Sequence, residues 1–514
     1  MPRRRANATL GALGVLLSGG AAIDHPAGAE PLPSLHQLGD IKPSDWAYQA
    51  LTGLIERYGC VAGATSSSAQ GNRSITRFEA AALLNACLAR VTTVSDEVRA
   101  LVSDFDNELA VLKGRVDGLE DTIGSLEAQA FSTTTKLSGL ATLVVGGNSF
   151  GGSAINSAAN AVNTATQGPL ALTNALTFNY DLKLTLDTSF NGSDLLRTEL
   201  RAGNFDTTSN SFGGGGPTTL STLETAYQEP AGAHVVGIYK LFYQIPLGGG
   251  FTATAGPRVA MEDMVAFWPS VYPDDTVLDV MTMAGAPVAY NYNRGAGVGL
   301  WWQRNGWSLS GNYVAYGGGD GNPGTGGIGT ANAASSGTLQ LGFHDERWGL
   351  ALTYSGVQNG VVPYATLSLL NGLNGSTSFT NAYALSGYWQ PAGAGWLPSI
   401  SAGWGINTTS SSAPAPAPLT SQSWSVGLQW QDVLVEANAF GLAFGQAPFV
   451  TSQSGSATPT DGNWMWEGWY KIQISDSISL TPAIFFLSRP LGQETPAGQS
   501  FNQLGALIKT QFRF

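Results

Sequence analysis

The sequence is poor in charge. Only 12% of its 514 residues are Asp, Glu, Lys or Arg, about half the share that is usual in a soluble globular protein. Long apolar runs are also missing: no stretch of about 20 consecutive apolar residues follows the N-terminal region, which excludes a helical membrane protein. The formal net charge is -12. This acidic balance argues against nucleic acid as a partner, because proteins that bind DNA or RNA carry basic patches.

Glycine and alternating segments are what the sequence has in abundance. It contains 66 glycines and many short stretches in which apolar and polar residues alternate, as in a strand with one apolar and one polar face. The clearest stretch runs from Leu176 to Leu186, where every second residue is Leu, Phe or Tyr. The last stretch, GALIKTQFRF, ends on the aromatic Phe514. Low charge, abundant glycine and repeated alternation are typical of a membrane β-barrel.

The connections between these segments alternate in length. Long loops rich in Gly, Ser, Thr and Asn are separated by seven short turns, at residues 187–194, 246–250, 304–306, 344–347, 391–396, 431–432 and 475–477. Seven turns and eight loops join sixteen strands, and both chain ends then lie on the short-turn side, as in outer-membrane barrels. We therefore predict an all-β transmembrane barrel of about 16 antiparallel strands over residues 132–514. The last strand would close on the first, and Phe514 would be read by the machinery that inserts such barrels.

The N-terminus has the parts of a secretory signal. A basic MPRRR precedes a short apolar region, and the small residues Ala27-Gly28-Ala29 precede a cleavage site. We expect residues 1–29 to be removed on export. Export places Cys60 and Cys87 in a compartment where disulfides persist, and we expect the two cysteines to pair.

Residues 35–91 predict a small helical domain. Its first helix has Ser44 or Asp45 as a cap and apolar residues at helical spacing. Its second helix opens with Thr76 and Glu79 at the spacing of a capping box. The two helices would cover each other's apolar faces. This pattern alone assigns no use to the hairpin.

A third helical segment has a narrow apolar stripe. From Val91 to Leu126 apolar residues recur mostly at alternating spacings of three and four, which is typical of a coiled-coil seam. We expect residues 92–130 to form a rod of roughly 60 Å that associates with other copies of the chain, because a lone helix this polar cannot bury its stripe. Between Val98 and Leu109 the spacing forms an eleven-residue unit, where the left-handed supercoil should relax.

The helical domain resembles a known family. LGDIKPSDWAYQALTGLIERYGC, GNRSITRFE and LLNACL are similar to the surface-layer-homology domain that precedes the barrel in cyanobacterial outer-membrane porins. The resemblance implies binding to a peptidoglycan-linked polymer, with Arg77 at the ligand groove and Asp45 and Trp46 supporting the fold. The sequence departs from the family's pattern at Ala80, where phenylalanine is usual, and at GATSSSAQ, which replaces the usual turn. The alternative for Arg77 is a solvated residue in the first turn of a helix.

The barrel segment also resembles a known family. LLRTELRAGNF, GPRVAMEDMVAFWPSVYP, GAGVGLWW, WSVGLQWQD and ISLTPAIFFL are similar to the carbohydrate-selective porins of cyanobacteria, which are also described as iron-uptake porins. The resemblance implies a homotrimer in outer-membrane lipid, with the N-terminal domain in the periplasm. Sugars, inorganic ions and iron species all fit such a pore.

Charged residues on the predicted water-facing side of the barrel are candidate pore-lining residues. On the strands these are Arg197, Glu199, Arg201, Lys240 and Arg258. On the third long loop they are Glu262, Asp263, Asp274 and Asp275, followed by Asp279. If that loop folds into the pore, an acidic loop faces a basic wall across a narrow gap, and charge in a constriction selects solutes. The alternative is that each is an ordinary residue of a barrel's water-facing side.

No pattern points to an enzyme, a cofactor or a metal site. Ser149 lies in a nucleophile-elbow pattern, but no helical period follows it. The four histidines are scattered without metal-ligand spacing, and the adjacent Glu262 and Asp263 are typical of a solvated loop. We therefore predict a porin for passive diffusion of small hydrophilic solutes, tethered to the cell wall. The alternative is mainly a structural anchor between the outer membrane and peptidoglycan.

Overall fold

The structure is a computed structural model. The residues that it describes are 40–58, 60, 75–88, 90–91, 94–113, 134–154, 173–215, 218–274, 277–360, 362, 364–373, 377–412, 415–455 and 459–514. The expected signal, residues 1–29, and the candidate Asp275 lie outside them. The chain divides into two compact units, residues 1–130 and 131–514. Within the described ranges, no helix is long and apolar enough to cross a membrane.

The described residues of the first unit form helices and a short sheet. These are α1 (Trp46–Tyr58), α2 (Arg77–Leu88) and α3 (Asp96–Asp104), with β1 (Asp40–Ile41) paired to β2 (Ile75–Thr76). The capping box that the sequence predicts is present before α2: the Thr76 amide donates to Glu79 Oε2 at 2.8 Å, and the Glu79 amide donates to Thr76 Oγ1 at 3.2 Å. Cys60 and Cys87 are joined by a disulfide, with their Cα atoms 4.9 Å apart.

The apolar stripe expected to form a coiled coil is partly used inside this unit. Val98, Leu101 and Phe105 are at most 2% exposed and pack in one core with α1 and α2. The helical domain therefore does not end at Val91. A stripe of this kind buries against its own chain when two neighbouring helices offer an apolar face, so the sequence pattern alone misplaces the boundary. Residues 114–130 of the expected coiled coil lie outside the described part of the chain.

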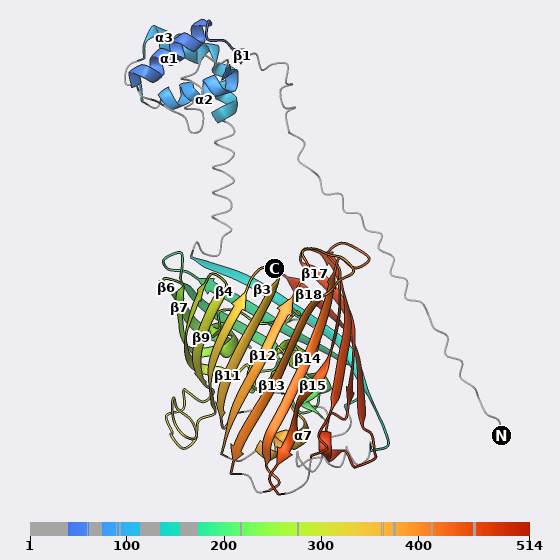
Figure 1. The fold of residues 1–514 in the computed structure, drawn as a ribbon. Helices are drawn as coiled ribbons and strands as arrows, with labels where there is room; N and C mark the ends of the chain where they lie inside the picture. Colours follow the sequence, from blue (N-terminus) through green and yellow to red (C-terminus); the bar gives the residue numbers. More distant parts are fainter. Residues whose placement is uncertain are drawn as a thin grey trace, which may run out of the picture. The chain divides into compact units, whose positions relative to one another are not determined.

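The second unit is the barrel that the sequence predicts (Figure 1). In the described residues, sixteen antiparallel strands pair in chain order, and β18 closes on β3. The strands are β3 (Thr135–Gly151), β4 (Thr177–Thr188), β5 (Leu195–Gly203), β6 (Gly237–Gly248), β7 (Phe251–Ala260), β8 (Arg294–Arg304), β9 (Trp307–Ala315), β10 (Ser335–His344), β11 (Trp348–Gln358), β12 (Ser378–Trp389), β13 (Ser399–Ser411), β14 (Pro418–Gln431), β15 (Ala439–Gln453), β16 (Trp464–Ser475), β17 (Ile478–Ser488) and β18 (Asn502–Arg513). The seven short turns of the sequence connect them at one end, which we call the short-turn end. The long loops lie at the other.

Side chains alternate between the two faces of the wall. On β10, Leu339 and Leu341 are exposed on the outside, whereas Thr338 and Gln340 are buried inside the barrel. Because side chains alternate with a period of two, apolar side chains lie on one face of each strand and polar side chains on the other. An apolar exterior and a polar interior suit a barrel that is surrounded by lipid.

The end of the chain closes the ring. The Gly139 amide donates to the Phe514 carbonyl at 2.7 Å, and the Phe514 amide donates back to Gly139 at 3.1 Å. A Cβ at Gly139 would lie 2.3 Å from the Phe514 ring, so any larger residue at this position would displace the ring. The alternating pattern that ends on Phe514 is thus the closing strand.

Candidate pore and its charged wall

The third long loop, residues 261–293, folds into the barrel. It contains the short helices η5 (Met261–Met264) and α6 (Asp279–Thr282). Its backbone is fixed to the inner face of five strands through the hydroxyls of Ser310 on β9, Ser355 on β11, Ser386 on β12, Ser401 on β13 and Ser423 on β14. The loop therefore crosses the lumen from β9 to β14.

One buried carboxylate holds the middle of this loop. Glu467 on β16 is 0% exposed. It accepts hydrogen bonds from the Tyr272 hydroxyl at 2.6 Å and from the Leu278 amide at 2.7 Å. The Trp469 indole donates to the same Tyr272 hydroxyl at 2.7 Å. Hydrogen bonds to a buried carboxylate are stronger than those between neutral groups, so this clamp fixes the loop against the wall.

Two further long loops pack on the third. The Asp279 amide donates to the Thr222 carbonyl of the second loop at 3.1 Å, and the Tyr364 hydroxyl of the fifth loop donates to the Asp279 carboxylate. Burial raises the pKa of Asp279 to about 7, and the negative charge of Glu224 acts in the same direction. Asp279, one of the acidic residues of the third loop, is therefore a junction between loops rather than a free charge in the lumen.

The predicted basic wall is partly neutralised by its own strands. Arg197 on β5 forms two hydrogen bonds with Asp187 on β4, at 2.8 and 2.7 Å. Arg201 pairs in the same way with Asp181, at 2.6 and 3.0 Å. Its guanidinium lies 4.5 Å from the centroid of the Tyr227 ring and is only 3% exposed. Arg201 is thus buried in a structural network and presents no free charge to water, contrary to the expectation that it faces the third loop across an aqueous gap.

The start of the third loop does meet the basic wall. Lys240 on β6 lies 2.7 Å from the Asp263 carboxylate and 3.4 Å from the Glu262 carboxylate. Arg294, at the start of β8, lies 3.8 Å from Glu262. Glu199 on β5 is the register partner of Lys240. Lys240 and Arg294 of the wall thus meet Glu262 and Asp263 at the start of the third loop.

Arg258 and Asp274 occupy more open positions. Arg258 on β7 is exposed, and its Nε donates to the Tyr239 carbonyl at 3.2 Å. It lies where the pairing of β7 is irregular on both sides: the register with β8 shifts between Gly256 and Val259, and the register with β6 shifts between Leu241 and Tyr243. Asp274 of the third loop is exposed. Val259, the neighbour of Arg258, packs against Met264 of the third loop, and the register partner of Arg258 is Leu241, which alternates with the inward Lys240, so Arg258 points away from the lumen, contrary to the expectation that it lines the pore.

Sequence reasoning missed the carboxylates that neutralise the wall. Asp181 and Asp187 lie directly across from Gly203 and Arg197 in the ladder between β4 and β5. Residues that face each other on neighbouring strands form pairs, and this register was a signal that could have identified Asp187 as the partner of Arg197. Glu467 gave no such signal, because its partners are almost 200 residues away in the sequence.

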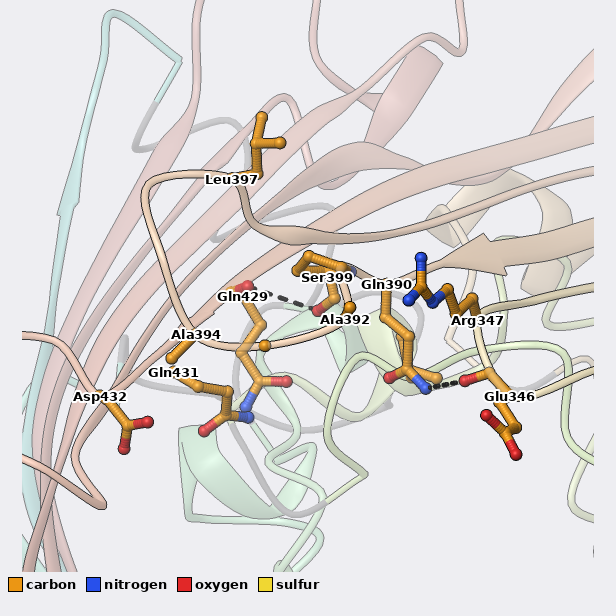
Figure 2. A pocket seen from close by; sticks show the side chains of 13 residues that line it. Glu346, Arg347, Gln390, Ala392, Ala394, Leu397, Ser399, Gln429, Gln431 and Asp432 are labelled. Atoms are coloured by element: carbon orange, nitrogen blue, oxygen red, sulfur yellow. Dashed lines mark hydrogen bonds between the residues drawn. The ribbon is translucent and has the colours of Figure 1, made fainter.

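A cavity lies at the short-turn end of the barrel. It has a volume of about 660 Å³ and is lined by residues from three short turns and by Val271 of the third loop. Figure 2 shows the side chains of Gln429, Gln431 and Arg347 around it. The side-chain amide of Gln390 donates to the Glu346 carbonyl at 2.7 Å. We call this cavity the vestibule. In the part of the chain with described coordinates, no three or more His, Cys, Asp or Glu residues are grouped as a metal site.

Comparison with known proteins places this barrel in a family. Residues 99–514 match the model of the carbohydrate-selective porin, OprB family. The chain belongs to this family. Its fold and family make this OprB-family protein an outer-membrane porin, a channel rather than an enzyme.

Curated relatives and solved structures are also similar to this porin. It is 31% identical to the uncharacterized protein alr4550 of Nostoc sp., over 93% of this chain and 84% of the relative. It is 28% identical to the uncharacterized protein sll0772 of Synechocystis sp., over 95% and 92%. Among solved structures, Pseudomonas putida OprB at high pH matches with a TM-score of 0.48 and 11% identity, over 76% of this chain and 97% of that one. An anion-selective porin from Comamonas acidovorans matches with a TM-score of 0.45 and 11% identity, over 74% and 99%.

Proposed function

We propose that this OprB-family porin lets small hydrophilic solutes diffuse passively through its barrel, past a charged constriction at the start of the third loop. The observation that carries the proposal is the contact of Lys240 on β6 with Glu262 and Asp263 of the third loop. This contact joins the in-folded loop to the wall and places both signs of charge at one level of the lumen. A constriction of mixed charge discriminates solutes by both size and charge.

The charges of this constriction act only over a short range. At physiological ionic strength, exposed charges are screened over roughly 8 Å, so opposed groups influence an ion only where the passage is narrow. Lys240 is largely compensated by its two acidic partners. Arg294 also lies beside this group, 3.8 Å from Glu262. We therefore expect Lys240, Arg294, Glu262 and Asp263 to set the ion selectivity together.

Reversal potentials across planar bilayers test this assignment. Lys240→Gln should shift selectivity toward cations, whereas Asp263→Asn should shift it toward anions because Lys240 then loses one of its partners. Both shifts should shrink in 1 M salt, where the screening length falls to about 3 Å. Arg99→Gln removes one positive charge from the first unit and serves as the control, with unchanged selectivity. Unchanged selectivity in both barrel variants would refute the charged constriction.

Sugars are the solutes that we propose first. The family that this chain belongs to is described as carbohydrate-selective, and inorganic ions would follow the same aqueous route. Iron species remain a further candidate from the resemblance. Liposome swelling with glucose, compared with a larger oligosaccharide, tests sugar permeation directly. A purified barrel that conducts no ions and admits no sugar would instead favour the structural anchor.

We also propose that the first unit lies in the periplasm and tethers the barrel to a peptidoglycan-linked polymer. Arg77 supports the proposal because its side chain remains 28% exposed, although it already pairs with Glu108 at 2.6 Å. Trp46 is also exposed, at the start of α1. Cosedimentation of the full chain with isolated cell walls tests the tether. Arg77→Gln should reduce binding and Glu108→Gln should not; equal losses in both variants would show that only the fold of the unit was affected.

We also propose that the protein forms a homotrimer, as the resemblance implies. The exposed apolar exterior of the barrel supports an environment of lipid or of neighbouring copies. Native mass spectrometry of the protein in detergent measures the number of chains directly. A single chain at all concentrations would exclude the trimer.

A further inference from the structure

The outer face of the barrel carries three adjoining apolar grooves on neighbouring strands from β9 to β14 (Figure 1). The first has a volume of about 360 Å³ and lies at the short-turn end, where Trp307, Phe343 and Trp348 line it. The second, of about 550 Å³, continues from the first toward the long loops, because Leu341 and Leu352 line both. The third, of about 610 Å³, shares two residues with each of the others. We call the three together the outer groove.

A row of aromatic rings marks the short-turn end of the outer groove. The ring centroids of Trp307 and Phe343 lie 5.2 Å apart, and those of Phe343 and Trp348 lie 5.0 Å apart. Aromatic side chains form girdles where the hydrocarbon of the outer membrane meets water, and the short turns of outer-membrane barrels lie on the periplasmic side. The row therefore lies at the headgroup level of the periplasmic leaflet.

The outer groove is about as long as one leaflet is thick. On β11 it extends from Trp348 to Tyr354, a separation of six residues. At about 3.3 Å per residue, this distance is about 20 Å along the strand. A strand tilted by about 40° then spans roughly 15 Å along the membrane normal. Because the hydrocarbon core is about 30 Å thick and each leaflet supplies half of it, the groove fits the acyl chains of one leaflet.

An exposed arginine lies at the rim of the outer groove. Arg304, the last residue of β8, is the register partner of Trp307. It shares the outer face of β8 with the exposed Leu300, because side chains alternate along the strand. In the part of the chain that the structure describes, the Arg304 side chain has no ion-pair or hydrogen-bond partner. The other Asp, Glu, Lys or Arg residue of β8 to β11 is Arg294, which contacts Glu262 in the lumen.

The carboxylates of the neighbouring short turn do not neutralise Arg304. Asp345 accepts hydrogen bonds from the amides of Arg347 and Trp348, at 2.7 and 2.9 Å. Glu346 lines the vestibule. The Arg304 guanidinium is therefore available at the headgroup level of the membrane. A guanidinium matches the geometry of a phosphate, to which it can donate two parallel hydrogen bonds.

We propose that the outer groove binds an anionic phospholipid of the periplasmic leaflet. The acyl chains of the lipid lie in the groove, and Arg304 donates hydrogen bonds to its phosphate. The two larger parts of the groove, of about 550 and 610 Å³, are similar in volume and lie side by side, which suits a lipid with two chains. The site requires no passage of solute, so it is independent of the proposed porin function.

Native mass spectrometry of the full chain in detergent, titrated with lipid, tests the phosphate contact. The probes are phosphatidylglycerol and a diacylglycerol with the same acyl chains, which lacks the phosphate. We expect phosphatidylglycerol to bind more tightly. Arg304→Gln should weaken its binding about tenfold, the usual scale for a hydrogen bond to a charged group, and should leave binding of the diacylglycerol unchanged. Lys136→Gln removes an exposed positive charge of β3, outside the groove lining, and should change neither.

A second variant tests the groove itself. Ala402 on β13 is exposed in the lining of the third groove, and its register partner on β12 is Gly387, which has no side chain. Ala402→Leu therefore fills the groove with another apolar side chain and should weaken binding of both lipids. Ala255→Leu adds the same side chain at an exposed position of β7, outside the groove lining, and should not. Heat-modified mobility on gels shows whether each variant is folded.

The outcomes separate a lipid from other occupants. Equal binding of the two lipids by the unaltered protein would overturn the site, as would unchanged binding of phosphatidylglycerol in Arg304→Gln. No lipid on the unaltered protein, together with fewer chains per particle in Ala402→Leu, would assign this face to neighbouring copies of the chain and overturn the proposal. The expected lipid binding in a barrel that conducts no ions would support the site and refute the porin function.

Discussion

Replacing Glu467 by alanine should release the middle of the third loop from the wall. The substitution removes the acceptor of the Tyr272 hydroxyl and of the Leu278 amide, both within a fully buried contact. A buried donor that loses its partner costs about 1–3 kcal/mol. The two donors together weaken the attachment of the loop by about 2–6 kcal/mol. The strand ladder does not depend on Glu467, so the barrel itself should remain folded.

Hydrogen exchange followed by mass spectrometry measures this release. We expect faster exchange of amides in residues 270–282 in Glu467→Ala, with unchanged exchange in β3 to β18. Single-channel recordings should show larger current fluctuations, because a loop that detaches changes the part of the lumen that it crosses. Glu467→Gln keeps one acceptor oxygen but turns an amide donor toward the same contacts, so its effect should be smaller.

A matched variant tests whether the clamp is specific. Glu436→Gln changes an exposed carboxylate in the turn between β14 and β15 and should leave both exchange and current noise unchanged. Unchanged exchange of residues 270–282 in Glu467→Ala would refute the reasoning. In that case the serine contacts on β9 to β14 alone would hold the loop.

Three further outcomes are expected. Gly139→Val should impair closure of the barrel, because a side chain there meets the Phe514 ring, and heat-modified mobility on gels should show fewer folded barrels; a normal yield would contradict this contact. Hydrogen bonding to Arg77 lowers the pKa of Glu108, so the pair stabilises the first unit at pH values above the ordinary glutamate pKa of about 4.3, and this stabilisation is lost as the pH falls through the lowered pKa. Near pH 7, Glu108→Gln should therefore lower the free energy of unfolding by about 0.5–1 kcal/mol, whereas in strong acid the variant and the unaltered chain should be equally stable. Hydrogen exchange of α3 measures this difference. Finally, thiol titration of the denatured, unreduced protein should find no free cysteine, and two thiols would exclude the disulfide.

The sequence was sufficient for the barrel because its signals are local. Alternation with period two, as from Leu176 to Leu186, fixes which side chains face outward on a strand, and turn length fixes which strands are neighbours. Each signal is repeated along sixteen strands, so an error in one would be corrected by the others. The capping box at Thr76 and Glu79 is equally local, since its two partners lie three residues apart.

The helical segment after Val91 shows where a local signal is ambiguous. The same apolar stripe serves a coiled coil or an internal core, and the sequence does not say which partner is nearer. The structure places Val98, Leu101 and Phe105 against α1 and α2. Only the packing of the three helices decides this choice.

The lumen depended on contacts between residues far apart in the sequence. Gly403 on β13 lets the third loop lie against the wall, because a Cβ there would lie 1.8 Å from the Ala284 carbonyl, and neither residue has a pattern that marks the contact. Arg201 has the same strand parity as Arg197, yet the second loop buries it against Tyr227. Parity is a property of one strand and follows from the backbone geometry. Whether an inward charge meets water, a neighbouring carboxylate or a folded loop is decided by how distant segments pack, and only the tertiary structure contains that information.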